Sequence, residues 1–288
     1  AALIERAAAL LDRLEGVLPE VSGGPDWSAH AFRWRKRNGR GFLQTLHDPQ
    51  RLDLDDLLCL DAQKAEIVRN TRQFLDGRCA NNVLLWGSRG TGKSSLVKAV
   101  FNAMRHEGLR LIEVDKDDLI DLADILDLIR RRPERFLVFC DDLSFESGES
   151  GYKALKAALE GSISAAPDNL LIYATSNRRH LLPEFQRENR EARAVDGEIH
   201  HGESVEEKVS LSDRFGLWIS FHPFSQAQYL TVVHHWLQRL GAGLQDHEET
   251  DRAALQWALR RGSRSGRTAW QFARDWAGRE QGEARRDT

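Results

Sequence analysis

The clearest chemistry in the sequence is carried by a glycine-rich segment at residues 87–94. It reads Gly-Ser-Arg-Gly-Thr-Gly-Lys-Ser, which matches the phosphate-binding pattern G-x-x-x-x-G-K-[ST]. Glycines let backbone N–H groups approach a phosphate closely, and Lys93 adds a positive charge for the β- and γ-phosphates. The Ser94 hydroxyl is suited to ligate Mg²⁺. The residues expected to bind a nucleoside triphosphate are Gly87, Ser88, Arg89, Gly90, Thr91, Gly92, Lys93, Ser94 and Ser95.

Two adjacent carboxylates, Asp141 and Asp142, follow an apolar run at residues 136–140. Downstream of a phosphate-binding loop, such a pair predicts a site for magnesium and water. Asp141 would hold Mg²⁺ through water, and Asp142 would act as the base that polarises the attacking water. The alternative is an acidic turn at the end of a strand, where aspartate is common. The apolar run before the pair favours the catalytic interpretation.

The segments that must position these groups alternate between strand and helix patterns. Short apolar strands are predicted at residues 82–86, 109–114, 135–140, 169–175 and 217–221, with helices at 52–76, 92–106, 119–129 and 152–159. The third strand is uniformly apolar, as expected for a strand buried on both faces. This alternation predicts an α/β fold with a parallel sheet between two layers of helices.

After Pro223 the strand patterns stop, and helices are predicted near residues 225–240, 251–261 and 267–278. This tail holds four of the eight tryptophans, which are Trp236, Trp257, Trp270 and Trp276. A small helical domain packs around large rings to bury enough area, although an aromatic docking surface is the other interpretation. We therefore expect three parts: an N-terminal helical extension at 1–49, a core at 50–222 and a helical lid at 223–288.

Two charged segments lie outside these patterns. Residues 33–40 carry five positive charges and Trp34, which predicts either a phosphate-contacting patch with a base-stacking ring or a solvated surface. Residues 183–210 contain eight acids and four bases with weak periodicity, and we expect a loop or short-helix insertion there.

The composition narrows the class of protein. A formal net charge of −3 disfavours a uniformly polybasic nucleic-acid binder but leaves room for a basic arm. No apolar run is long enough to cross a membrane, so we expect no membrane partner. Three cysteines without metal-ligand spacing fit reduced thiols, and the expected location is the cytoplasm.

Three later segments complete an ordered set with the phosphate-binding loop and the aspartate pair. The fourth predicted strand ends in Thr175-Ser176-Asn177, residues 211–216 read Leu-Ser-Asp-Arg-Phe-Gly, and residues 265–268 read Ser-Gly-Arg-Thr. A guanine-reading N-K-x-D motif of small GTPases is absent from the sequence. The set resembles the AAA+ ATPases, which implies a P-loop NTPase core with a C-terminal helical lid.

That resemblance also implies roles for individual residues. Asn177 is similar to sensor 1, which orients the hydrolytic water. Arg214 resembles the arginine finger that acts in trans on the nucleotide of a neighbouring subunit. Arg267 resembles the sensor 2 arginine of the lid, with Arg264 as the rival for that role. The family's usual geometry places adenine near Leu57, Leu60 and Asp61.

The chain is closer still to a bacterial AAA+ family designated domain of unknown function 815. The segments that carry this resemblance are residues 81–87, 140–145, 207–218 and 261–269. It implies a homo-oligomer that binds ATP and ADP and hydrolyses ATP with Mg²⁺ at a subunit interface, driving conformational change in a protein or nucleic-acid client. The Ser-Asp-Arg-Phe-Gly run also resembles replication initiators and helicase loaders. The alternatives are therefore a nucleic-acid-associated loader and a weakly hydrolysing nucleotide switch or scaffold.

Overall fold

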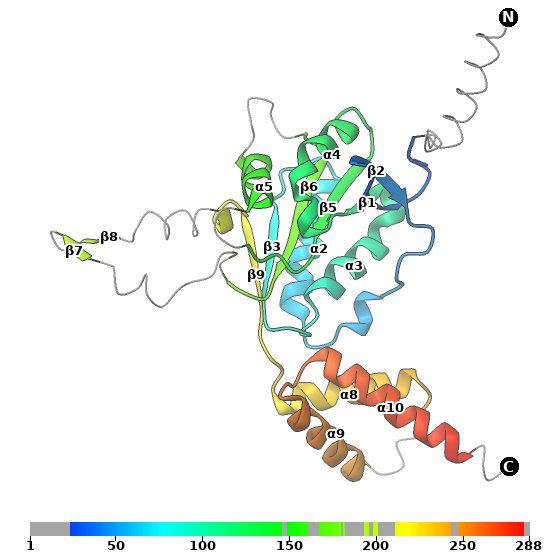
Figure 1. Cartoon of the computed structure of the whole chain (residues 1–288). Coiled ribbons are helices and arrows are strands. Elements are labelled where there is room, and N and C mark those ends of the chain that lie inside the picture. The colour runs from blue at the N-terminus through cyan, green and yellow to red at the C-terminus, as the bar shows by residue number, and fades with distance from the viewer. Residues whose placement is uncertain are drawn as a thin grey trace, which may run out of the picture.

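The computed structural model of the chain describes residues 24–145, 149–160, 167–179, 181, 193–195, 198–200, 211–242 and 247–284. Within these residues the chain forms a sheet covered by helices on both faces, with a further group of helices at one end (Figure 1). Residues 1–23, for which we predict a helix at 1–20, lie outside the described part.

The central sheet has seven strands in the order β2-β1-β4-β5-β6-β3-β9. All neighbours are parallel except β1 and β2, which pair antiparallel. The strands are β1 Ala31–Arg37, β2 Arg40–Thr45, β3 Val83–Gly87, β4 Leu109–Glu113, β5 Arg135–Cys140, β6 Leu170–Ser176 and β9 Leu217–Phe221. The five strands predicted from the sequence are confirmed, and so is the three-layer α/β fold.

Helices cover both faces of this sheet, because its central strands are apolar on both sides. One layer holds α2 Asp61–Leu75 and α3 Lys93–Met104, and the other holds η3 Lys116–Asp121, α4 Leu122–Ile129 and α5 Ser150–Glu160 (Figure 1). The side chains of β3 alternate between two hydrophobic clusters: Leu85 joins the cluster of α2 and α3, while Leu84 joins that of α4 and α5. This packing fixes the carboxyl ends of the strands, where the predicted polar residues lie.

The N-terminal part differs from the prediction. Residues 31–45 were expected in a helical extension, but they form the β1–β2 hairpin, and β1 pairs with β4 in the core sheet. Asn38 and Gly39 turn the hairpin with φ angles of 51° and 74°, as a type I′ turn requires. Trp34 is buried under the hairpin with 1% of its surface exposed. The core sheet therefore begins before residue 50, and the Asn-Gly pair was the signal for it.

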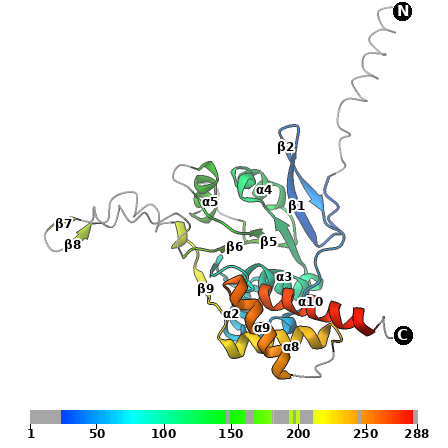
Figure 2. The ribbon, with the colours of Figure 1, turned by 60° about the horizontal axis from the view of Figure 1, so that its bottom comes forward.

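The C-terminal helices are α8 Gln226–Arg239, α9 His247–Arg261 and α10 Gly266–Ala284, which confirms the predicted helical tail. Ser225 and Gln228 form a capping box that starts α8. Figures 1 and 2 show these helices beside the end of the core that carries α2 and α3. Buried residues of α8, α9 and α10 belong to the same hydrophobic cluster as α2 and α3, so the lid and that layer share one continuous core.

Most of residues 183–210 lies outside the described part. The exceptions are two short strands, β7 Arg193–Val195 and β8 Glu198–His200, which pair antiparallel. None of the helices that the structure describes is long and apolar enough to pass through a lipid bilayer.

Candidate nucleotide-binding site

The loop between β3 and α3 has a backbone that only glycine adopts easily. Gly87 has a φ of 132°, and a Cβ there would lie 1.9 Å from the carbonyl oxygen of Phe221 in β9. Gly92 has a φ of 107° directly before the first turn of α3. Positive φ and close backbone approach both exclude larger residues. The predicted phosphate-binding loop therefore lies between a strand and a helix N-terminus, the context that this motif needs.

Lys93 points back into this loop. Its ammonium donates to the carbonyl oxygens of Gly87 at 2.7 Å and Ser88 at 2.8 Å, and to Oδ1 of Asn177 at 3.0 Å. Burial lowers the pKa of Lys93, while the nearby charges of Asp142 and Asp141 act in the opposite direction. The structure thus brings together the predicted loop lysine and the predicted Asn177 at the end of β6.

An oxygen-rich cluster forms around Asp141. The Ser94 hydroxyl donates to Oδ1 of Asp141 at 2.6 Å, and the Thr175 hydroxyl donates to the same atom at 2.5 Å. Hydroxyl and carboxylate oxygens are ligands that Mg²⁺ accepts. The sequence reasoning named Ser94 and Asp141 but gave Thr175 no role. Thr175 could have been found from its position, because it lies at the end of β6, the strand beside β5, and parallel strands end at the same sheet edge.

Asp142 has a left-handed backbone, with a φ of 52°. Its N–H donates to the Thr175 hydroxyl at 2.8 Å, and its carboxylate accepts a hydrogen bond from the Asn177 amide. Arg89 of the phosphate-binding loop lies 3.8 Å from the same carboxylate. Non-glycine residues with positive φ are uncommon and cluster at functional sites. The backbone turn aims the Asp142 carboxylate at Asn177 rather than along the strand.

The lid contributes Arg267 at the start of α10. Its N–H donates to the carbonyl oxygen of Gly90 at 3.1 Å, so the lid touches the phosphate-binding loop directly. The Arg267 side chain lines the same cavity as Lys93. Arg264, in contrast, is not among the described residues that line this cavity. The two arginines that the sequence offered for the sensor 2 role therefore differ in position, since only Arg267 lies at the cavity.

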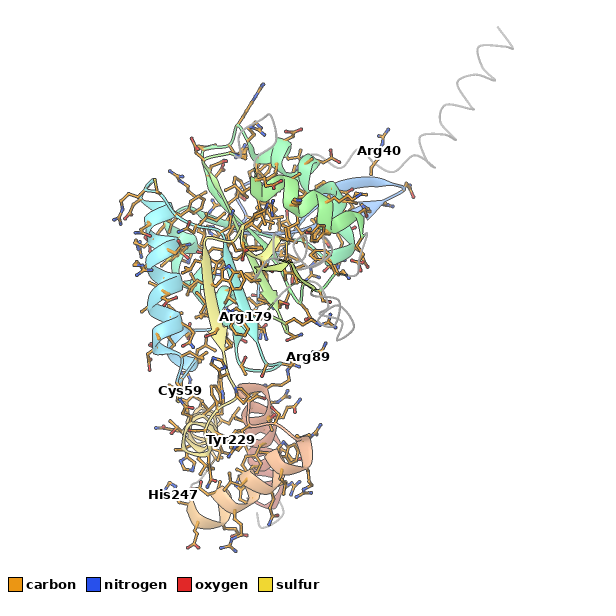
Figure 3. All side chains as sticks on the ribbon, turned by 90° about the vertical axis from the view of Figure 1, so that its left-hand side faces the viewer. Arg40, Cys59, Arg89, Arg179, Tyr229 and His247 are labelled. Carbon is orange, nitrogen blue, oxygen red and sulfur yellow. The ribbon has the colours of Figure 1, made fainter. Side chains whose placement is uncertain are left out.

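A cavity of about 770 Å³ lies between the core and the lid. Figure 3 shows Arg89 where the core meets the lid helices. Part of the lining is polar and comes from the phosphate-binding loop and from the carboxyl ends of β5 and β6. The apolar residues of the lining are Leu52, Leu57, Leu58, Leu60, Phe224, Val232, Trp236 and Trp270. Leu57 and Leu60 were predicted near the adenine, while Asp61 is not among the described lining residues.

The lid tryptophans divide into two groups. Trp236 and Trp270 line the cavity, with ring centroids 4.6 Å apart and an interplanar angle of 65°. Trp257 and Trp276 each pack against Phe272 inside the lid. Packing within the lid, one of the two predicted roles, is thus seen for Trp257 and Trp276, while Trp236 and Trp270 pack on each other and also line the cavity.

Arg214 lies apart from this cavity. It is not among the described residues lining it, and its guanidinium forms an ion pair with Glu160, the last residue of α5. The structure therefore does not bring Arg214 together with Lys93, Asp142 and Asn177 within one chain.

The basic segment at residues 33–40 is mostly neutralised within the fold. Arg33 pairs with Glu113 and Arg35 with Asp115, while Lys36 lies 2.9 Å from Asp121. The buried Trp34 donates its indole N–H to Asp121 at 2.9 Å. A base-stacking role for Trp34 is therefore excluded, because strand alternation turns its ring into the core.

Comparisons with known proteins agree with this architecture. The family model described as "Protein of unknown function (DUF815)" matches residues 27–280. A solved mutant of Thermotoga maritima RuvB has 14% identity and a TM-score of 0.52, covering 78% of this chain and 64% of that chain. A second RuvB mutant has 16% identity with the same coverage and TM-score.

The structure of Aeropyrum pernix Orc1 in complex with DNA has 14% identity and a TM-score of 0.50, covering 75% of this chain and 60% of that chain. The chain thus spans less than two thirds of these proteins, and at such identity the likeness concerns the fold alone. No curated protein sequence matches the chain. The chain belongs to the DUF815 family, and its fold is that of the AAA+ ATPases.

Proposed function

We propose that the chain binds ATP with Mg²⁺ between core and lid and hydrolyses it at an interface between two copies of itself. The energy would drive conformational change in a protein or nucleic-acid client. One observation carries this proposal: a single cavity of about 770 Å³ is lined by the phosphate-binding loop, Asp141, Asp142, Asn177 and Arg267. The cations of the loop and the lid, Lys93 and Arg267, line the same cavity as the two aspartates. This combination suits a polyphosphate bound together with a metal ion.

The phosphate end of ATP would be held by the loop and its lysine. Lys93 now donates to two loop carbonyls, and phosphate oxygens would replace these acceptors. The burial that lowers the pKa of Lys93 is then offset by phosphate charge, so nucleotide binding favours the protonated amine. Arg89 and Arg267 lie close enough to act on the charge of Lys93, and they supply further cations to the same end.

The residues around Asp141 fit a magnesium ion. Ser94 and Asp141 already place two oxygens 2.6 Å apart, and Thr175 fixes the carboxylate from the neighbouring strand. A bound Mg²⁺ neutralises charge on the β- and γ-phosphates. Ser94 and Asp141 are therefore the proposed metal residues.

Asp142 is the proposed base. The Asn177 amide holds its carboxylate, which gives the pair one orientation toward the cavity. General base catalysis of this kind contributes about 10²–10⁴-fold to a rate. Many AAA+ proteins have glutamate at this position, as the family resemblance implies. Because aspartate is one methylene shorter, we expect slow turnover.

Arg214 is not among the described residues that line the cavity of its own chain. This position supports a role in trans, on the nucleotide of a neighbouring copy. A fixed guanidinium stabilises charge that develops on the transferred phosphoryl group. If Arg214 acts on a neighbouring copy, the complete site needs at least two chains. A nucleic-acid-associated loader stays the first alternative. The second is a nucleotide switch acting through residues 183–210, most of which lie outside the described part.

The decisive experiment measures ATP binding and ATP hydrolysis separately. Lys93→Ala should abolish both, whereas Arg214→Ala should keep binding and lose turnover. The wild-type rate per chain should rise with protein concentration until assembly is complete. Tight ATP binding by Lys93→Ala, or a rate per chain that stays constant on dilution into the monomer range, would contradict the proposal.

A further inference from the structure

Arg214 extends from a backbone that the core holds firmly. Its N–H donates to the carbonyl oxygen of Leu211 at 3.3 Å, and the next residue, Phe215, donates to Ser212 at 3.0 Å. Leu211, Ser212 and Phe215 are all buried. The Ser212 hydroxyl also accepts from the N–H of Leu181 at 3.3 Å. The backbone that carries Arg214 is therefore fixed, and a change of partner requires movement of the side chain alone.

In the single chain that guanidinium has a partner already. The Glu160 carboxylate, 54 positions away in the sequence, accepts its hydrogen bond and forms an ion pair with it. Glu160 ends α5, which is anchored on the core by the buried Tyr152 and Leu155. The Arg214 side chain is 21% exposed and that of Glu160 is 42% exposed. The arginine thus lies partly covered against its own subunit.

This pairing opposes the chemistry proposed for Arg214. A guanidinium stabilises a transferring phosphoryl group through its positive charge, and a bound carboxylate cancels much of that charge. Both partners are partly exposed, so the pair is weak enough to be exchanged for a stronger ligand. A phosphate presented by a second copy is such a ligand, because it offers more negative charge and a matching fork of oxygens.

We propose that Glu160 is a positioning residue that restrains Arg214 within the separated subunit and releases it on assembly. This inference rests on the proposed trans role of Arg214 and adds its regulation. The Glu160–Arg214 pair makes assembly more costly, since it must be broken when the arginine moves to the neighbouring nucleotide. The pair therefore raises the protein concentration at which the ATPase becomes active.

The test compares Glu160→Gln with the wild type in the full chain, measuring ATPase rate against protein concentration. Removing an exposed ion pair should lower the concentration for half-maximal activity by about two- to five-fold. The rate at saturating concentration should change little, because Arg214 stays in place. The activation curve of the variant should also depend more on salt than that of the wild type, because no internal ion pair is broken to offset the new arginine–phosphate pair.

Glu149→Gln is the matched control. Glu149 pairs with Lys116 at 2.9 Å near the other end of α5, with similar exposure of both side chains, and does not involve Arg214. This variant should keep the wild-type activation curve, while Glu160→Asp should restore part of the restraint. Circular dichroism and ATP affinity confirm that each variant is folded and binds nucleotide.

Two outcomes overturn the inference while leaving the proposed function intact. One is an unchanged or higher half-maximal concentration for Glu160→Gln, with Arg214→Ala inactive. The other is a shift of equal size in Glu149→Gln. If Arg214→Ala hydrolyses ATP normally, the trans role itself fails, and the inference falls with it.

Discussion

The carboxylate of Asp56 accepts a 2.9 Å hydrogen bond from the guanidinium of Arg239, which lies 183 positions further along the chain. His235, one turn earlier on the same helix, contacts the same oxygen at 3.2 Å. Asp56 belongs to η1 Leu54–Asp56 before α2, while Arg239 and His235 belong to the lid helix α8. Asp56 also lines the cavity. One carboxylate therefore connects the lid to the part of the cavity where the adenine is predicted to bind.

Asp56→Asn should therefore loosen the lid. The Asp56 side chain is 10% exposed, and loss of its charge removes the ion pair with Arg239 and weakens the contact with His235. We expect a loss of about 1–3 kcal/mol in the free energy of unfolding, with a raised KM for ATP. Hydrogen exchange in α8 and denaturant unfolding check this. Asp251→Asn is the control, since it breaks the 2.6 Å contact to His234 inside the lid. An equal rise in KM in both variants would argue against a specific role of Asp56 in holding the lid at the ATP site.

Arg267→Ala and Arg264→Ala should behave differently. Arg267 lines the cavity and contacts the loop at Gly90 through its backbone, whereas Arg264 is not among the described residues that line it. Loss of a cation beside the transferred phosphate should lower kcat/KM by about 10²–10³-fold, the range seen for single stabilising groups. Arg264→Ala should stay within about twofold of the wild type. Steady-state kinetics distinguish the two, and the reverse order would assign the sensor role to Arg264.

Asp142→Asn should separate binding from hydrolysis. The amide keeps the shape of the side chain but cannot take a proton, so single-turnover hydrolysis should fall about 100-fold or more. ATP affinity should change little, because the loop and Lys93 are untouched. The variant held with ATP is also suited to retain a client for identification. Unchanged ATP consumption would favour the switch interpretation or a contaminating enzyme.

Trp236→Leu should weaken ATP binding, because it removes an aromatic ring on which the adenine can stack. Stacking of a base on an aromatic ring contributes about 1–3 kcal/mol, so Kd for ATP should rise about tenfold. Affinity for inorganic tripolyphosphate, which has no base, should stay unchanged. Trp257→Leu is the control, because that ring packs against Phe272 within the lid. Equal losses for ATP and tripolyphosphate would place the effect in the fold of the lid instead.

Lys36→Ala tests whether the hairpin contacts nucleic acid. Lys36 lies 2.9 Å from Asp121, and Trp34 donates to the same carboxylate. We therefore expect a small loss of stability, under about 1 kcal/mol, since the pair is partly exposed. DNA binding, measured across a salt series, should keep the same slope. A slope reduced by about one would instead assign a phosphate contact to Lys36.

The sequence alone determined the local elements of this protein. The phosphate-binding loop, the five central strands and the three C-terminal helices each follow from patterns within a short window, where glycine and apolar spacing decide the backbone. The carboxyl-end residues Asp141, Asp142 and Asn177 could be placed at one sheet edge, because parallel strands end together. The turn residues Asn38 and Gly39 offered the same kind of local signal for the hairpin.

Only the tertiary structure decided which distant surfaces meet. The pairing of β1 with β4, the position of Arg267 beside the phosphate-binding loop and the pairing of Arg214 with Glu160 all join segments far apart in the chain. No short window contains both partners, and amphipathic patterns show that a face is buried but not what covers it. Packing of the whole core selects these contacts, since side-chain shapes and charges must be satisfied together.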